Sequence, residues 1–492
     1  MRSQPVFTSP LRALSSFSTR FASSALLVFS ATQVSAAGFE FPESGSKATQ
    51  RSGAFIAGVN DPTAGFLNPG ALSRLRGLQF TYNHNLIWSD VTFQRDTSVI
   101  PPTIEGEVGR GESSNQDSFF PLNGLIALSY KPEGSDLTFG GSVLGPNGAG
   151  SSRYDVSGAQ RYMMTELEGI LAFAGLSVAY GGDHWGVGVT PQYAFMPMMR
   201  YQMVVDGTLT STLNPYESDM DVEAEVSVSD YTAFTAQVGA WYRPNPQFEI
   251  AASGRVLPVH FNAQGGISIM TTPTGTPFVD SQLEIEDGRA SFDLTLPPVA
   301  RLGLRYRELD GNLRSGERFD VELAVVYEAW HMVDSFDVKL DGIVKLLGET
   351  PLTDVTIEKR WRDTVSVRLG GTYHVSDALS LSMGGFYEQG ASEEAYAHID
   401  FPSFDRSGAS VGLGYRLELG ERAVELMLGG LHIFKSSSSV SETYAKVFQQ
   451  RPLAPCPDGC EVDDVKYSGV PANAGTISVD ITSLSLGVKF EL

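Results

Sequence analysis

The chain has little charge, little positive charge in particular, and no long apolar run in its main body, and each shortage excludes a class of protein. Charged residues make up 19% of the 492 positions, below the usual ~25%. Lys and Arg number 35 against 57 Asp and Glu, for a net charge of −22. A nucleic-acid partner requires a basic surface, so we exclude one. A membrane-spanning helix requires about 18 apolar residues in a row, so we exclude a helical membrane protein.

The sequence also lacks the motifs of catalysis and metal binding. The seven His residues show no spacing that suits a metal site. Residues 408–412 (GASVG) match the pattern G-x-S-x-G, but a nucleophile at Ser410 requires a strand, a sharp turn and a helix. Here Ser410 sits inside a continuing alternating strand. We therefore predict no catalytic residue, no metal and no cofactor, and a protein that is not an enzyme.

The N-terminus predicts a secretion signal. Arg2, Arg12 and Arg20 supply positive charge, and residues 21–31 form an apolar stretch too short to span a bilayer. Val34-Ser35-Ala36 resembles a signal-peptidase site. We expect residues 1–36 to be a signal peptide.

From residue 77 onward the chain alternates between apolar and polar residues. Helical spacing is weak there, and we count 14 extended runs. The predicted strands are 77–95, 119–132, 136–145, 164–180, 184–206, 229–243, 247–263, 289–307, 318–337, 362–375, 377–390, 406–419, 421–435 and 474–492. Short turns alternate with long polar loops, including 96–118, 207–228, 265–288, 340–361 and 435–475. That asymmetry is typical of outer-membrane barrels.

The apolar face of each strand must contact either lipid or another protein layer. In strand 184–206, Val187, Val189 and Tyr193 share one face, opposite Thr190 and Gln192. A soluble β-sandwich also alternates, but it seldom combines so many long strands with one-sided loops. Lipid requires a closed barrel, because an open edge leaves backbone groups unpaired. We predict an all-β, 14-stranded antiparallel transmembrane β-barrel over residues 77–492, located in the outer membrane.

Residues 37–76 do not alternate, because Gly, Ala, Asp and Pro interrupt them repeatedly. A barrel of 14 strands has a lumen too wide for its wall side chains to fill. We expect this segment to fold into the lumen as a hatch; the alternative is a loose periplasmic tail.

Several stretches resemble the outer-membrane transporters of long-chain fatty acids and hydrocarbons (FadL/TodX-type). The resemblance begins at residues 37–46 (AGFEFPESGS), continues through residues 61–64 (DPTA) and includes Asn68-Pro69-Gly70, where family members have Asn-Pro-Ala. It extends to residues 296–306, 321–330 and 361–388. The resemblance implies a 14-stranded barrel with an N-terminal hatch that takes up apolar molecules.

The outer end of strand 184–206 is rich in Met, which adapts to irregular apolar partners. We predict a capture surface that includes Met196, Met198 and Phe278, the last of which lies in the long loop 265–288. The alternative is that Met199 and Met203 merely face lipid by parity, which leaves Met196 and Met198 inward.

An acidic cargo would also need a cation. Arg200 points inward by parity and Lys339 lies near an outer strand end, so both are candidates. Inward arginines elsewhere are expected to pair with acids and hold barrel and hatch together. These are Arg301, Arg305, Arg368 and Arg416, with Asp320, Glu322 and Glu328 as partners.

Two places are candidate gates. Hatch movement near Asn68, Pro69 and Gly70 would release cargo, and the resemblance implies a sideways exit at a kinked third strand. That strand ends in Gly145-Pro146, where Pro cannot donate to the ladder and Gly weakens it. The alternative is the ordinary start of an outer loop.

We therefore expect passive uptake of long-chain fatty acids or other hydrophobic compounds through an outer groove, a lumenal pocket and a hatch-gated lateral exit. The expected partners are the cargo, outer-membrane lipid and the barrel-assembly machinery. Two alternatives stay open: a polar-solute porin and a barrel enzyme that modifies lipids.

The two cysteines predict a small disulfide loop. Cys456 and Cys460 flank Pro457-Asp458-Gly459, which suits a tight turn, and an exported protein meets oxidising conditions. Thiol labelling of the unfolded chain should modify both only after reduction. Labelling without a reductant would contradict the disulfide.

Overall fold

The computed structural model describes residues 45–96, 111–145, 151–206, 221–273, 284–313, 315–345, 349–420, 422–450 and 467–492. The predicted signal peptide, Pro146, Phe278, Cys456 and Cys460 lie outside these described residues. Within them, no helix is long and apolar enough to cross a membrane.

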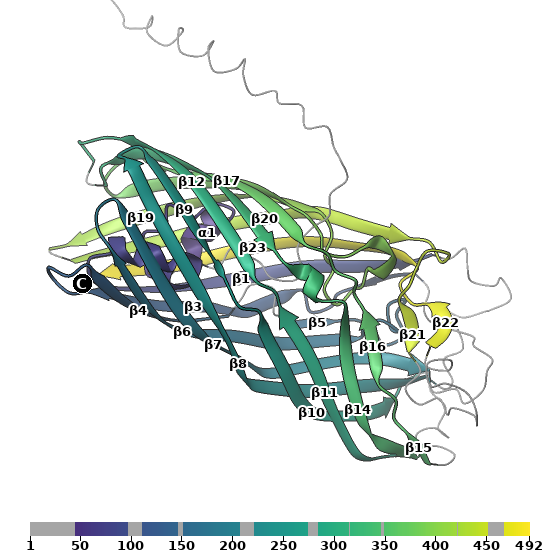
Figure 1. Ribbon diagram of the computed structural model, residues 1–492. Helices are drawn as coiled ribbons and strands as arrows, with labels where there is room; N and C mark the ends of the chain where they lie inside the picture. The colour runs from purple at the N-terminus through teal and green to yellow at the C-terminus, as the bar shows by residue number, and fades with distance from the viewer. Residues whose placement is uncertain are drawn as a thin grey trace, which may run out of the picture. The chain divides into compact units, whose positions relative to one another are not determined.

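The chain forms a closed antiparallel ring of 14 strands, several of which are interrupted (Figure 1). In ring order they are β1 (Gly77–Arg95), β3 (Phe119–Lys131), β4 (Leu137–Leu144) with β5 (Ser151–Arg153), β6 (Glu166–Gly181), β7 (Trp185–Asp206), β8 (Asp221–Asn245), β9 (Phe248–Arg255) with β10 (Val259–Thr271), β12 (Val299–Leu309) with β11 (Glu284–Leu296), β13 (Glu317–Glu328) with β14 (Ser335–Lys345), β17 (Thr364–His374) with β16 (Val355–Glu358) and β15 (Glu349–Pro351), β18 (Leu379–Glu388), β19 (Arg406–Leu419), β20 (Arg422–Val440) and β23 (Gly475–Glu491). The predicted fold class and strand count are confirmed.

Short elements lie beside or inside the ring. β2 (Glu112–Ser114) pairs with β1, and β21 (Phe448–Gln450) pairs with β22 (Tyr467–Pro471). The helices are α1 (Ser46–Gln50), α2 (Ala64–Leu67), η1 (Pro69–Arg74), η3 (Trp330–Met332) and η4 (Glu394–Tyr396).

The ring closes where the last strand meets the first. β23 pairs with β1 from Gln79↔Glu491 to Arg95↔Gly475, and β1 pairs with β3 on its other side. No sheet edge is therefore left at this junction, which is the condition for a strand protein in hydrocarbon.

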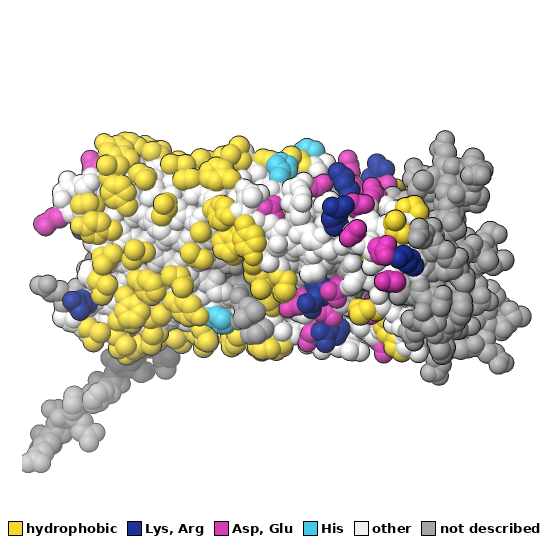
Figure 2. All heavy atoms as spheres, turned by 90° about the horizontal axis from the view of Figure 1, so that it is seen from below, with side chains coloured by type: hydrophobic (Ala, Val, Ile, Leu, Met, Phe, Trp, Pro, Cys, Tyr) yellow, Lys and Arg dark blue, Asp and Glu magenta, His cyan; other side chains and the backbone are white. Residues whose placement is uncertain are grey.

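Alternation along the strands places apolar side chains on the outer surface. On β13, Val321, Leu323, Val325 and Tyr327 are 36–42% exposed, while Asp320, Glu322 and Glu328 between them are buried. Near the short-turn end, aromatic rings pack along this surface, such as Phe248 on Tyr306 with centroids 5.2 Å apart. Figure 2 shows that apolar side chains cover one end of the visible face and that charged side chains gather toward the other.

Several strands run further outward than the sequence predicted. β8, β11 and β14 include residues 221–228, 284–288 and 340–345, which we had assigned to long polar loops. That assignment is wrong, because the outer face of these extensions carries charges such as Glu286 and Lys345, which form an ion pair. A strand whose outer face is polar shows no apolar–polar alternation in its sequence, so the alternation does not identify it as a strand.

The outer apolar face predicts a specific instability. Leu323 lies midway between the aromatic positions Phe319 and Tyr327 on β13 and is 42% exposed. Leu323→Arg should destabilise the folded barrel by roughly 2–4 kcal/mol, because a charge there enters the middle of the bilayer. Denaturant titration in lipid vesicles measures this.

The control is Ser268→Arg, on the polar outer face of β10. It should change stability by about 1 kcal/mol or less. Equal losses for the two variants would contradict the placement of the membrane.

Candidate functional site

Residues 45–76, the inner segment, lie inside the ring. α1 contacts β18, β19, β20, β23 and β1, whereas η1 contacts β4, β6, β7 and β8 on the other side. Most of its side chains are buried, including those of Ile56, Leu67 and Leu72. The segment therefore contacts the wall on both sides of the lumen.

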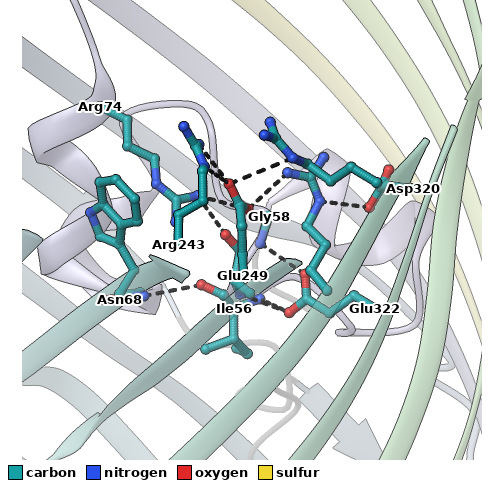
Figure 3. A network of polar contacts seen from close by, with 12 residues as sticks. Ile56, Gly58, Asn68, Arg74, Arg243, Glu249, Asp320 and Glu322 are labelled. Atoms are coloured by element: carbon teal, nitrogen blue, oxygen red, sulfur yellow. Dashed lines mark hydrogen bonds and ion pairs between the residues drawn. The ribbon is translucent and has the colours of Figure 1, made fainter. Parts of the chain in front are cut away.

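A wall carboxylate binds the middle of the inner segment. The Glu322 carboxylate accepts the backbone N–H groups of Ile56, Ala57 and Gly58 at 2.6, 2.8 and 2.8 Å, and it is fully buried (Figure 3). Beside it, the Arg51 guanidinium donates to both oxygens of Asp320 at 3.1 and 2.6 Å. Three N–H donors directed at one acceptor make a strong, charge-assisted contact.

A second buried carboxylate is shared by several arginines. Glu249 on β9 contacts Arg243 at 2.6 Å, Arg305 at 2.9 Å and Arg74 of the inner segment at 3.5 Å (Figure 3). Arg305 also reaches Asp320 at 2.9 Å. The expectation that inward Arg305 pairs with Asp320 is confirmed, and the wall and the inner segment share one ionic network.

The Asn68-Pro69-Gly70 motif packs directly on wall backbone. The Asn68 Nδ2 donates to Ile56 O at 3.0 Å and to Ala240 O on β8 at 3.3 Å. A Cβ added to Gly239 would lie 2.1 Å from Asn68 Oδ1, and one added to Gly70 would lie 2.7 Å from Gly239 O. Gly70 stands where the family motif has Ala. It fits this space because a methyl group at position 70 would collide with the backbone of β8.

An apolar cavity, cavity 1, lies outward of the inner segment. Its volume of about 140 Å³ is close to that of an engineered apolar cavity that binds benzene. Its wall includes Ile87, Val91, Phe120, Leu167, Gly169, Leu171, Met196, Met199, Leu294, Ile399, Phe401, Phe404, Ile433, Val479 and Ile481, with Ser151, Ser152, Asp400 and Arg406 among the polar residues. A ring or a short alkyl chain therefore fits it.

A smaller apolar cavity, cavity 2, lies in the outward extensions. It has a volume of about 40 Å³ and is lined by Met199, Tyr201, Met203, Val205, Ala224, Val226, Val228, Ile267, Phe292, Phe336, Val338, Leu340, Val355 and Ile357. Met199 lines both cavities, so the two meet at this side chain.

The facing that we predicted for the outer part of β7 is wrong after Pro197. Met199 and Met203 face the cavities instead of lipid. Met196 faces inward as expected, whereas Met198, which was expected to point inward, is half-buried and lines neither cavity. The register to β8 shifts between Ala194 and Met199. A bulge at a strand Pro reverses the alternation, so the side chains beyond it exchange faces.

The same bulge moves Arg200 away from the lumen. Tyr201 lines cavity 2, and Arg200 lies on the opposite face beside Glu168 and Glu225, at 3.3 and 3.6 Å. Lys339 is exposed between Val338 and Leu340, which line cavity 2. Their role in binding cargo stays a prediction that this geometry does not favour.

The third strand of the ring is interrupted where cavity 1 meets the wall. On β6, pairing to β4 ends at Phe173 and pairing to β5 begins at Glu168. Gly169 and Leu171, between these points, line cavity 1, and Gly145 still donates to Gly124 O of β3 at 3.2 Å. Within the described residues, this part of β6 has no strand partner on the side of β4 and β5.

A buried cluster of charged groups lies beside cavity 1, and sequence analysis did not identify it. The Asp400 carboxylate contacts Lys359 Nζ at 2.6 and 2.7 Å and His398 Nδ1 at 2.8 Å. Burial opposes the ionised form of Asp400, but His398 and Lys359 outweigh it and hold the pKa of this carboxyl well below its usual range. Burial lowers the pKa of His398. These residues lie in or beside loops with no periodic pattern, so the sequence gives no signal for the cluster.

Comparison with known proteins identifies the family. The family model of outer membrane transport proteins, OMPP1/FadL/TodX, matches residues 27–454. The chain belongs to this family. It is accordingly an outer-membrane protein, as predicted. A 47 kDa outer membrane protein of Pasteurella multocida is 29% identical over 111 residues, which are 23% of this chain and 24% of that protein.

Solved FadL/TodX structures share the fold. A FadL homologue of Pseudomonas aeruginosa has a TM-score of 0.68 at 15% identity, with 92% of this chain and 99% of that chain covered. The toluene transporter TodX of P. putida has a TM-score of 0.63 at 12% identity, with 92% and 98% covered.

Ser410, the centre of the G-x-S-x-G match, lies within strand β19 as expected. Its Oγ is 2.8 Å from Ser52 Oγ of the inner segment, and the residue is 4% exposed. This contact holds the inner segment against the wall.

Glu322 is the group whose loss should loosen the inner segment most. Glu322→Gln replaces one acceptor oxygen by an N–H₂ group that meets backbone donors, and it leaves Arg51 with less negative charge around it. Docking of the inner segment should weaken by roughly 3–5 kcal/mol. Hydrogen exchange should accelerate at the amides of residues 45–76 while the strand amides stay protected.

The matched control is Asp310→Asn, which weakens a half-buried ion pair with Arg318 in a turn outside the inner segment. It should leave exchange in residues 45–76 unchanged. Unaltered exchange in Glu322→Gln would contradict the contact described here.

Proposed function

We propose that the protein is a passive outer-membrane transporter for hydrophobic compounds, namely long-chain fatty acids or hydrocarbons. The observation that carries the proposal is the pair of apolar cavities that meet at Met199 inside the ring. Exposing an alkyl chain to water costs about 0.8 kcal/mol per CH₂ group. A chain of dry cavities avoids that cost, whereas a water-filled pore does not.

The proposed path begins in the outward extensions of the barrel. Cargo enters near cavity 2, passes Met199 and collects in cavity 1. It leaves sideways at the third strand of the ring, beside Gly169 and Leu171 of β6, toward the membrane. The TodX likeness supports a hydrocarbon cargo through the name of that relative, a toluene transporter.

Residues 37–76 act in this proposal as the hatch. The ionic contacts at Glu322 and Glu249 fix one side of it. Movement at Asn68-Pro69-Gly70, which packs on β8, is the step that would release the cargo in this proposal. We further propose that outer-membrane lipid surrounds the apolar face and that the barrel-assembly machinery inserts the chain.

The cavity at the short-turn end argues against that end as the exit for cargo. It has a volume of about 540 Å³ and is lined by charged residues that include Lys47, Arg305, Glu317 and Glu425. An apolar molecule gains little there, because those groups hold water. A sideways exit keeps the cargo in contact with apolar surface.

The test is a charge placed at the junction of the cavities. Met199→Lys should reduce uptake of a fluorescent fatty acid or of toluene into proteoliposomes by about tenfold or more, because cargo would have to pass a buried ammonium group. Met199→Leu, which keeps the apolar volume, should transport at nearly the wild-type rate.

Two results would overturn the proposal. One is equal uptake by both variants. The other is ion conductance in planar bilayers together with no fatty acid or hydrocarbon extracted from the purified protein, which would indicate a polar-solute porin.

A further inference from the structure

The strand ladder of the wall is broken between β8 and its neighbour on the side away from β7. β9 pairs with β8 between residues 237 and 245, and β10 pairs with it between residues 222 and 229 (Figure 1). Residues 230–236 of β8 and residues 256–263 opposite them, all of which the structure describes, form no ladder pair. Pro258 lies in this stretch and has no N–H to donate. We call the stretch the β8–β10 gap.

Side chains replace the missing ladder bonds in the β8–β10 gap. Thr235 Oγ1 donates to Leu257 O at 2.7 Å. The buried Asp230 carboxylate accepts from the backbone N–H groups of Asn262 and Thr232, each at 2.7 Å. These are single contacts that break one at a time, whereas a ladder opens as a unit. The gap therefore opens at a smaller cost than a paired stretch of the same length.

The inner side of the β8–β10 gap adjoins cavity 1. Met196 lines cavity 1 and is the ladder partner of Asp230 on β8. Leu294 also lines cavity 1 and is the ladder partner of Phe261 on β10. Phe261 faces inward and is 1% exposed. Its aromatic ring therefore lies at the inner edge of the gap, beside the cavity wall.

The outer side of the β8–β10 gap is apolar as well. Tyr231 and Phe234 on β8, and Val256 and Leu257 across the gap, are 46–55% exposed on the outer surface. An apolar molecule that crosses the gap would leave the apolar wall of cavity 1 and meet apolar side chains again outside. It stays out of water throughout, which favours its passage.

The charge at the β8–β10 gap selects among apolar compounds. Asp230 is the acid in residues 230–236 and 256–263, and neither stretch contains Lys or Arg. A cargo carboxylate brought beside Asp230 would be repelled, strongly so where little water screens the two charges. A neutral molecule meets no such barrier.

We propose that the β8–β10 gap is a second sideways passage between cavity 1 and the membrane, which Phe261 closes and which neutral apolar compounds use. The inference rests on the proposed function and adds a route apart from the third strand, from which β6 and β7 separate it. Displacement of the Phe261 ring opens the passage. Carboxylic acids are left with the route at the third strand.

The experiment closes the passage with a disulfide. Ala236 and Val256 lie opposite each other across the gap, since Val256 N–H donates to Ala236 O at 3.1 Å. Such a position suits a disulfide. In the oxidised double variant Ala236→Cys/Val256→Cys, initial uptake of labelled toluene into proteoliposomes should fall by about half and recover on reduction, because a locked passage carries no flux. Uptake of palmitate should not change. The single variant Val256→Cys is the control and should respond to neither treatment.

A second variant opens the passage. Phe261→Ala removes the aromatic ring, so toluene uptake should rise by about threefold, and the oxidised disulfide should abolish this rise. Phe93→Ala is the matched control, because Phe93 is a fully buried Phe of β1 that lines neither cavity. It should leave toluene uptake unchanged. If Phe261→Ala fails to fold, Phe261→Leu removes less volume and takes its place.

The outcomes separate the two proposals. Toluene uptake that the formed disulfide leaves unchanged would overturn the second passage, as would a rise in Phe261→Ala that persists when the disulfide is formed. Equal losses of toluene and palmitate uptake in the oxidised variant would overturn the selection for neutral cargo. A wild-type protein that takes up neither compound would overturn the proposed function itself.

Discussion

The pairing of β23 with β1 is the contact on which the rest of the structure depends. It leaves no open edge at the junction of the first and last strands, and a membrane tolerates strands only under that condition. Closure at 14 strands then produces a wide lumen. The chain must fill that lumen, and it does so with its own residues: the inner segment toward the short-turn end and the loop between β18 and β19, residues 389–405, toward the other.

The inner segment and the loop between β18 and β19 are held in the lumen by different contacts. The inner segment is fixed by buried carboxylates of the wall, Glu322 and Glu249, which accept from its backbone and from Arg74. The loop between β18 and β19 is held in the opposite way: the residue after β16, Lys359, supplies the cation, and Asp400 of the loop supplies the acid. The apolar cavities lie between these two sets of polar contacts. A cargo would therefore bind in apolar space, with ionic contacts on the inner and the outer side of that space.

Much of the fold is readable from the sequence, because lipid imposes a period of two residues on each strand. The strand count and the lipid-facing side of β13 follow from that period alone. The prediction fails where lipid contact ends. Beyond Pro197 a bulge exchanges the faces of Met199 and Arg200, and the outward extensions carry charges outside, so no alternation marks them.

The candidate site was less predictable for a different reason. Its residues come from distant parts of the chain, and only the closed ring brings Lys359 to Asp400 or Arg51 to Asp320. Neither pair has a local pattern that marks it as buried. Gly70 is an intermediate case: its departure from the family motif is visible in the sequence, but the reason, a wall backbone oxygen in the place of a methyl group, is visible only in the structure.

The most direct test of dry, cargo-holding space inside the barrel is a crystal structure with a brominated hydrocarbon. Anomalous scattering from bromobenzene, which matches cavity 1 in size, locates the halogen without reference to any mechanism. We expect bromine between Met196 and Leu171, inside the ring. Bromine found only on the outer, lipid-facing surface, with ordered water in cavity 1, would contradict it.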